Sequence, residues 1–161
     1  MEEYQPYLPF RKVFSYQQHN TATAKKVFPL LCPEREKDWL DGWNYKMIYS
    51  QSGLVEQDCV FQTTQNGNAP TTWMVTKYDQ PGKSIEFFRI KPLEYVVKIN
   101  IDLEDLGDGT CHSNIAYQYT ALTHLQADFI HHHMEEFFTQ SMQWWEEAIN
   151  HYLNTGEILK K

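Results

Sequence analysis

Three histidines in a row, His131, His132 and His133, are the most conspicuous side chains in this chain that could perform chemistry. Neighbouring residues of a helix point about 100° apart, so these imidazoles cannot bind one ion together. Only residues four apart share a helix face, such as His131 and Glu135, and two ligands are too few for a catalytic metal. We therefore expect no metal and no cofactor, and we keep His133 as a candidate pocket residue.

A cysteine before a predicted helix is a second candidate, because a helix N-terminus lowers the pKa of a thiol. Cys32 precedes Pro33, but it also ends an apolar run that starts at Val27, and no histidine lies nearby in the sequence. Together with Cys59 and Cys111 it gives neither a disulfide framework nor a metal knuckle. We interpret Cys32 as a buried structural residue and expect reduced thiols, as in the cytoplasm.

Aromatic residues make up 15% of the 161 residues, with 5 Trp, 10 Tyr and 9 Phe. So many rings either fill a large core or line an internal cavity. The net charge is −7 and no basic cluster interrupts it, so we predict no nucleic-acid partner. No apolar run approaches about 18 residues and the N-terminus is not a signal peptide, so we predict a cytoplasmic protein without membrane insertion.

A sheet and one long helix must position these rings. Residues 1–9 are predicted to be an irregular lead-in, and residues 10–161 a single domain. A first strand is expected at 10–19, followed by short helices at 23–31 and 34–40. Six more strands are expected, separated by turns too short for a crossover helix: 43–50, 58–64, 71–79, 84–91, 94–104 and 110–121. Successive strands therefore pair antiparallel.

The last predicted element is a helix over 123–154, which carries a single apolar stripe. This stripe must cover one face of the sheet, which gives an α+β architecture. Alternation of apolar and polar residues directs Tyr95 and Ile99 toward the helix. A three-residue loop before the last strand directs Tyr117 and Tyr119 to the same face.

The faces of the two preceding strands depend on turn lengths. A two-residue Pro-Leu turn directs Phe88 and Glu86 inward and Arg89 outward. Pairing one strand further back adds Trp73 and, opposite Glu86, Lys77 to the inner face. Changing a turn by one residue would bring Arg89 inward instead, so whether Glu86 or Arg89 faces the interior stays open.

This order of elements resembles the START-like superfamily, also called SRPBCC, and in particular its small bacterial members of unassigned role. The superfamily includes polyketide cyclase/dehydrase-like, lipid-transfer and plant pollen-allergen-like domains. The similarity rests on Trp73 and on the segments 24–39 (AKKVFPLLCPEREKDW), 42–43, 52–61, 117–122 (YQYTAL) and 152–156 (YLNTG).

The resemblance implies a helix-grip fold, in which a curved antiparallel sheet wraps around the C-terminal helix and encloses a pocket. It also implies that Trp43 closes one end of that pocket. The predicted ligand-binding residues are the inward rings and the facing helix residues: Trp43, Trp73, Phe88, Tyr95, Ile99, Tyr117, Tyr119, His133 and Phe137.

Three classes of function remain open. The chain could bind a hydrophobic or aromatic small molecule, lipid-like or polyketide-like, in this cavity. It could instead be a cyclase, dehydratase or isomerase in which His133, Glu86 or a tyrosine performs acid–base chemistry. A protein-interaction module is the third class. The sequence does not decide between a monomer and a homodimer.

Overall fold

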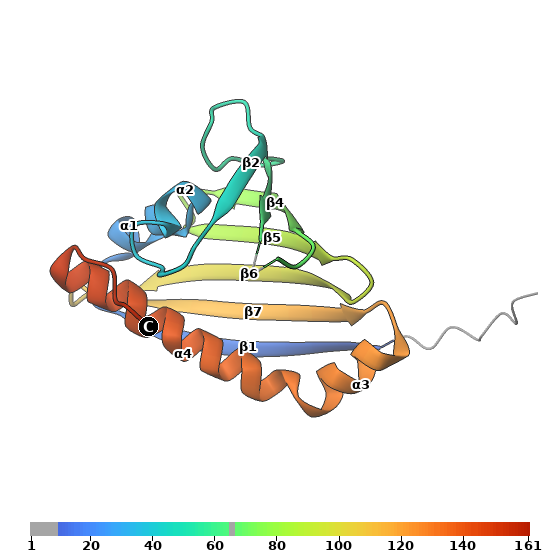
Figure 1. Ribbon diagram of the computed structural model, residues 1–161. Helices are drawn as coiled ribbons and strands as arrows, with labels where there is room; N and C mark the ends of the chain where they lie inside the picture. Colours follow the sequence, from blue (N-terminus) through green and yellow to red (C-terminus); the bar gives the residue numbers. More distant parts are fainter. Residues whose placement is uncertain (1–9, 65–66) are drawn as a thin grey trace, which may run out of the picture.

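The fold consists of a seven-stranded antiparallel sheet and a broken C-terminal helix (Figure 1). The structure is a computed structural model that describes residues 10–64 and 67–161. The lead-in predicted for residues 1–9 lies outside the described residues. The elements in chain order are β1 (Arg11–Asn20), α1 (Ala24–Val27), the 3₁₀ helix η1 (Phe28–Leu31), α2 (Pro33–Glu36), β2 (Tyr45–Tyr49), β3 (Val60–Thr63), β4 (Thr71–Asp79), β5 (Ser84–Lys91), β6 (Tyr95–Asp105), β7 (Cys111–Ala121), α3 (His124–His132) and α4 (Met134–Thr155).

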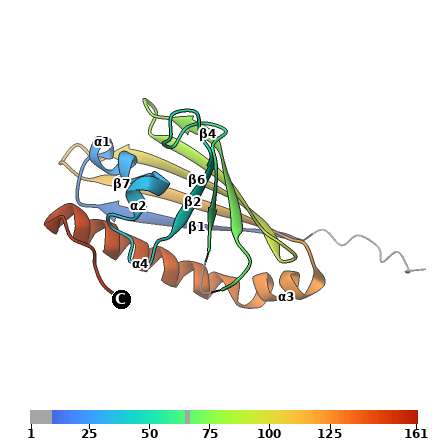
Figure 2. The same ribbon diagram turned by 45° about the horizontal axis from the view of Figure 1, so that its top comes forward.

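The strands lie in the order β1-β7-β6-β5-β4-β3-β2. The sheet is curved: β2, β3 and β4 turn away from the plane of β1, β7 and β6, and α4 lies on the concave side (Figures 1 and 2). The predicted α+β architecture is therefore confirmed. The predicted register of the last two strands is also confirmed, because Ile99 pairs with Tyr117 and Ile101 with Ile115. Ile99 and Ile101, each 1% exposed, lie on the concave face, which we call the inner face.

The predicted faces of β5 were wrong. Its pairing with β6 begins at Lys91 and Tyr95, so the connecting turn has three residues instead of two. Side chains alternate along a strand, so one extra turn residue exchanges the two faces of the whole strand. Phe88 and Glu86 therefore lie on the outer face, and Arg89 lies on the inner face opposite Val97.

A β-bulge changes the second half of β4. Trp73 and Val75 face inward as predicted, but the register shifts between Val75 and Lys77. Lys77 still pairs with Glu86, as predicted, although both lie on the outer face. Tyr78 takes the inward position beyond the bulge and packs against the core. The bulge thus keeps a lysine out of the interior and places a ring there.

The predicted long helix is present as α3 and α4, which meet at His133, where the backbone leaves the helical range at φ −128°. Figures 1 and 2 show α4 running along β1. Phe138 of α4 packs against Phe14 of β1 and Tyr117 of β7, with ring centroids 5.7 and 5.1 Å apart. The helix therefore covers the part of the inner face formed by β1 and β7.

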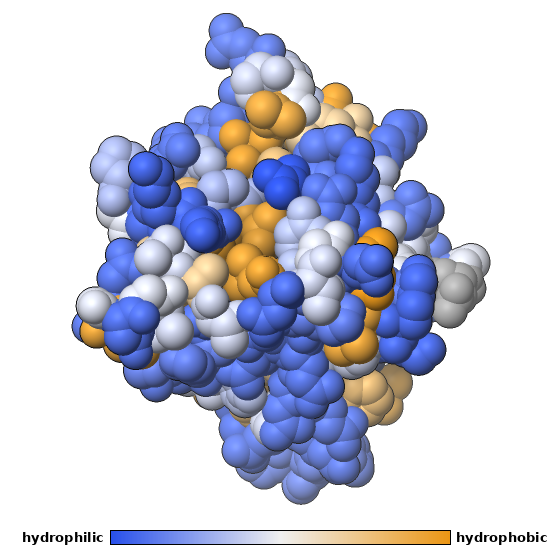
Figure 3. Space-filling model, turned by 90° about the vertical axis from the view of Figure 1, so that its left-hand side faces the viewer, coloured by the Kyte–Doolittle hydropathy of each residue, from blue (hydrophilic) through white to orange (hydrophobic). Residues whose placement is uncertain are grey.

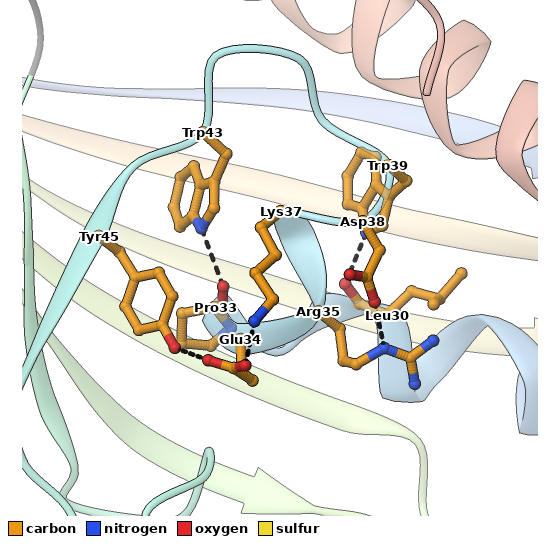
Figure 4. A network of polar contacts seen from close by, with 9 residues as sticks. All are labelled: Leu30, Pro33, Glu34, Arg35, Lys37, Asp38, Trp39, Trp43 and Tyr45. Carbon is orange, nitrogen blue, oxygen red and sulfur yellow. Dashed lines mark hydrogen bonds and ion pairs between the residues drawn. The ribbon is translucent and has the colours of Figure 1, made fainter. Parts of the chain in front are cut away.

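The short helices and two tryptophans close one end of the molecule. Trp39 is fully buried, its Nε1 donates to the carbonyl of Leu30 at 2.9 Å, and its ring lies 5.3 Å from that of Trp145 in α4. Trp43 is half-buried and donates to the carbonyl of Pro33 at 2.9 Å (Figure 4). These contacts fix α2 between the sheet and α4.

The last residues of the chain fasten the same end. Leu159 forms a bridge with Leu40, and the Lys160 ammonium lies 2.9 Å from the Asp41 carboxylate. Viewed from this side, apolar side chains gather in the middle of the surface and polar side chains surround them (Figure 3). None of the helices in the described residues is long and apolar enough to cross a bilayer.

We predict that Trp39→Phe destabilises the fold by about 2 to 4 kcal/mol, because it removes a buried hydrogen bond and leaves a void beside Trp145. Trp43→Phe is the matched control: it removes an equivalent hydrogen bond from a half-buried position, so we expect a loss of about 1 kcal/mol. Urea unfolding of the three proteins gives both values. Equal losses for the two variants would contradict the central role of Trp39.

Candidate functional site

Half-buried aromatic rings gather on the inner face of β4, β6 and β7. The rings of Tyr95 and Tyr117 lie against that of Tyr119, with centroids 5.3 and 6.1 Å apart. Trp73 lies in the same cross-strand row as Tyr119, three strands away. Whereas Tyr119 is buried, the other three rings keep part of their surface accessible.

Arg89 lies among these rings. Its guanidinium carbon is 5.0 Å from the centroid of Trp73 and 5.5 Å from that of Tyr117, and Nη2 donates to the hydroxyl of Tyr119 at 3.4 Å. The side chain is half-buried, and no carboxylate of residues 10–64 or 67–161 forms an ion pair with it. A positive charge on an aromatic surface is thus left without a counter-ion from this part of the chain.

The phenols beside Arg89 are held in their neutral form. Burial raises the pKa of both Tyr117 and Tyr119 above the usual value for tyrosine, and the charge of Arg89 offsets only part of this rise. Both hydroxyls can therefore donate and accept hydrogen bonds at neutral pH. One cation and neutral phenols on an aromatic surface can bind a polar group of an otherwise apolar molecule.

Glu36 of α2 supplies a second polar group. Its side chain is only 8% exposed and forms no hydrogen bond or ion pair with a described residue. Burial raises the pKa of this carboxyl to about 8, and its charge in turn raises the pKa of Tyr117. The carboxyl is therefore mostly protonated at neutral pH and can donate a proton.

Of the three acids in and next to α2, Glu34, Glu36 and Asp38, only Glu36 is buried. Figure 4 shows Glu34 with Lys37 and Tyr45, and Asp38 with Arg35. Glu36 instead points into the protein. Its spacing gives the missing signal, because a residue four after Cys32 and three before Trp39 lies on the same buried helix face.

Comparison with solved structures places this arrangement in a known fold. Norcoclaurine synthase from Thalictrum flavum is 13% identical, with a TM-score of 0.69 over 96% of each chain. Ara h 8.0201 is 13% identical, with a TM-score of 0.64 over 90% of this chain and 99% of that one. The di-domain ARO/CYC BexL of the BE-7585A biosynthetic pathway is 11% identical, with a TM-score of 0.67 over 89% of this chain and 46% of that one. The chain has the helix-grip fold of these structures. No protein-family model and no curated protein matches the sequence.

The helix-grip fold brings five of the predicted site residues onto one face: Trp73, Tyr95, Ile99, Tyr117 and Tyr119. Trp43 lies toward α2 and connects to this group through a series of rings. It stacks on Tyr45 at 6.4 Å, Tyr45 contacts Phe61 edge-on at 6.4 Å, and Phe61 stacks on Trp73 at 5.5 Å. That these residues bind a ligand stays a prediction.

The other predicted residues lie elsewhere. Phe88 is on the outer face, and Glu86, also there, accepts a hydrogen bond from the Thr76 hydroxyl at 2.8 Å. His133 is exposed, and Phe137, predicted to face the sheet, is 61% exposed. Both line an open hollow of about 500 Å³ formed by residues of α3, α4 and their junction.

A second hollow, of about 300 Å³, lies between polar residues of β1, β6 and β7, and most of these residues belong to the outer face. Cys32 is buried, as predicted, and Cys59 and Cys111 are buried as well. Within residues 10–64 and 67–161, no group of three His, Cys, Asp or Glu side chains could hold a metal ion. The polar side chains described above for the candidate site are those of Arg89, the tyrosines and Glu36.

We predict that Glu36→Gln changes how stability depends on pH. The pKa of this carboxyl is about 8 in the folded protein, and it is about 4.3 in an unfolded chain. Below the unfolded pKa the carboxyl is protonated in both states. Between the two pKa values it ionises only in the unfolded state, and this ionisation lowers the free energy of the unfolded state. Wild-type stability relative to Glu36→Gln should therefore fall as the pH rises from about 5 to about 8, by up to a few kcal/mol, since one pKa unit corresponds to about 1.4 kcal/mol.

Glu34→Gln is the control for this experiment. Hydrogen bonds from Lys37 and Tyr45 lower the pKa of Glu34, so its contribution is present above the unfolded pKa and is lost as the pH falls. The stability of the wild type relative to Glu34→Gln should therefore stay constant between about pH 5 and 8 and fall only at lower pH, whereas that relative to Glu36→Gln falls as the pH rises. A pH dependence identical in wild type and Glu36→Gln would show that Glu36 is ionised in the folded protein.

Proposed function

We propose that this chain binds a hydrophobic or aromatic small molecule between α4 and the inner face of β4 to β7. The observation that carries the proposal is a contrast within that face. Phe61, Val75 and Ile99 are at most 1% exposed, as expected in a packed core. Trp73 and Tyr117 lie beside them on the same side of the sheet but are only half-buried. Aromatic rings left open on a concave face offer a planar apolar molecule a place to stack.

Solved structures with this fold support the proposal only by analogy. One structure of norcoclaurine synthase from Thalictrum flavum contains dopamine and hydroxybenzaldehyde, which are both aromatic. Another relative in fold is an ARO/CYC protein of a biosynthetic pathway. At 11–14% identity none of their residues can be carried over to this chain. The ligand proposed here is therefore defined by the rings and hydroxyls of this chain alone.

We expect Tyr117→Phe to keep the fold and to weaken the binding of 2-naphthol, an aromatic molecule with one hydroxyl, by up to about tenfold through loss of one neutral hydrogen bond. Phe88→Leu on the outer face is the control and should leave the affinity unchanged. Quenching of tryptophan fluorescence measures binding, and thermal unfolding measures stability. If 2-naphthol does not bind, or if stability falls in step with affinity in both variants, the inner face is a packed core.

A second candidate function, an enzyme that uses acid–base chemistry, is favoured by Glu36. A buried carboxyl with a pKa of about 8 is suited to protonate a bound carbonyl or hydroxyl near neutral pH. Dehydration or cyclisation of a bound β-hydroxy ketone would fit this chemistry. Such turnover should be lost in Glu36→Gln while binding persists, and turnover that survives the substitution would exclude Glu36 as the acid.

A further inference from the structure

We propose that the small molecule bound on the inner face carries a carboxylate or a similar oxyanion, and that Arg89 binds this group. The inference rests on the proposed function, since it specifies the ligand of the same site. It is argued from the position and contacts of Arg89 in this chain and not from the proteins that share its fold.

Arg89 is a permanent charge without a counter-ion. A guanidinium stays protonated at any ordinary pH, and a charge held against apolar surface is costly unless an opposite charge meets it. Here the neighbours are the rings of Trp73 and Tyr117 and the hydroxyl of Tyr119, all uncharged. Among residues 10–64 and 67–161, no acidic side chain forms an ion pair with Arg89.

The one acid whose charge acts on the neighbouring Tyr117 is Glu36, and it is not the missing partner. It belongs to α2, at the end of the molecule away from the β5–β6 turn that Arg89 precedes (Figure 1). Its carboxyl makes no contact with Arg89 and is mostly neutral at pH 7, because burial raises its pKa to about 8. The positive charge on the inner face is therefore left for a group from outside the described chain.

The geometry of Arg89 suits an oxyanion. A guanidinium has five N–H donors in one plane, and only one of them has an acceptor here, at the long distance of 3.4 Å. None of its nitrogens is both sealed from solvent and unpaired. The remaining donors can bind the two oxygens of a carboxylate side by side. Trp73 and Tyr117 lie against the guanidinium carbon, so an aromatic body attached to that carboxylate would meet rings directly beside the charge.

The test compares two ligands of equal shape, 2-naphthoate and its uncharged analogue 2-naphthamide, by titration calorimetry at neutral pH. We expect the wild type to bind the acid at least about tenfold more tightly than the amide, since hydrogen bonds between charged partners are the stronger class. In Arg89→Met this preference should disappear, whereas the affinity for the amide should change by less than about threefold.

Arg11→Met is the matched control. Arg11 is exposed on β1, where Nε donates to the hydroxyl of Thr120, so its loss removes the same charge away from the inner face. We expect the preference for the acid to be unchanged in this variant. Equal loss in both variants would show an effect of net charge only and would overturn the proposal.

Thermal unfolding separates ligand binding from a structural role of Arg89. Replacing an unpaired charge by an apolar side chain of similar length should leave the melting temperature unchanged or raise it. A marked fall would mean that the rings need the cation for stability, and would contradict the proposal. Arg89→Lys gives a second test, since it keeps the charge but not the paired donors; it should bind the acid several-fold less tightly and the amide equally well.

The outcomes distinguish this inference from the proposed function. If wild type and Arg89→Met bind both naphthalenes equally, the face binds aromatic molecules and only the inference about Arg89 fails. If the wild type binds neither the acid nor the amide, the proposed function itself fails, and the inference fails with it.

Discussion

The position of α4 along β1 is the constraint on which the rest of the structure depends, and side chains of the helix fix it by satisfying the backbone where β1 ends. Glu146 accepts hydrogen bonds from the His19 amide at 2.6 Å and from the Tyr16 hydroxyl at 3.1 Å. Asn150 accepts from the Thr21 amide and donates to the His19 carbonyl. Because the helix is held at this edge strand, it packs on β1 and β7, and the rings on β4 and β6 remain partly open.

The sequence was sufficient for the architecture and for the strands whose turn is glycine-rich. Gly107 and Gly109 adopt positive φ, so the loop before β7 has a recognisable composition, and the register that follows from it is confirmed. The turn before β6 has no such signal. Its extra residue is accommodated by Leu93, which adopts φ 64°, a conformation that leucine seldom takes. The residue types in this turn do not indicate that it has three residues, so Arg89 could not be assigned to the inner face.

A further error concerns the long helix, where Phe137 was predicted to face the sheet. Phe137 and Phe138 are neighbours, and side chains about 100° apart cannot both face the sheet, so only Phe138 is buried. Glu36 is buried despite its polarity, because it lies on the same face as Trp39. In the candidate site, the apolar and aromatic residues could thus be predicted from periodicity. The two polar groups could not, since burying them runs against the preference of their side chains for water.

Glu36 and Arg89 both lower the stability of the fold, because each places a polar group against apolar surface. An ion pair between the Glu36 carboxyl and the Arg89 guanidinium would reduce this loss of stability and remove the free charge from the inner face, but the described residues form no such pair. Instead Glu36 is kept neutral by burial, and Arg89 lies among the rings of Trp73 and Tyr117. In an ion pair neither group would be free to bind a ligand. Without the pair, Glu36 remains a proton donor and Arg89 remains an unpaired cation. Packing alone would favour apolar side chains at both positions, so their separation is best explained by a molecule that uses them.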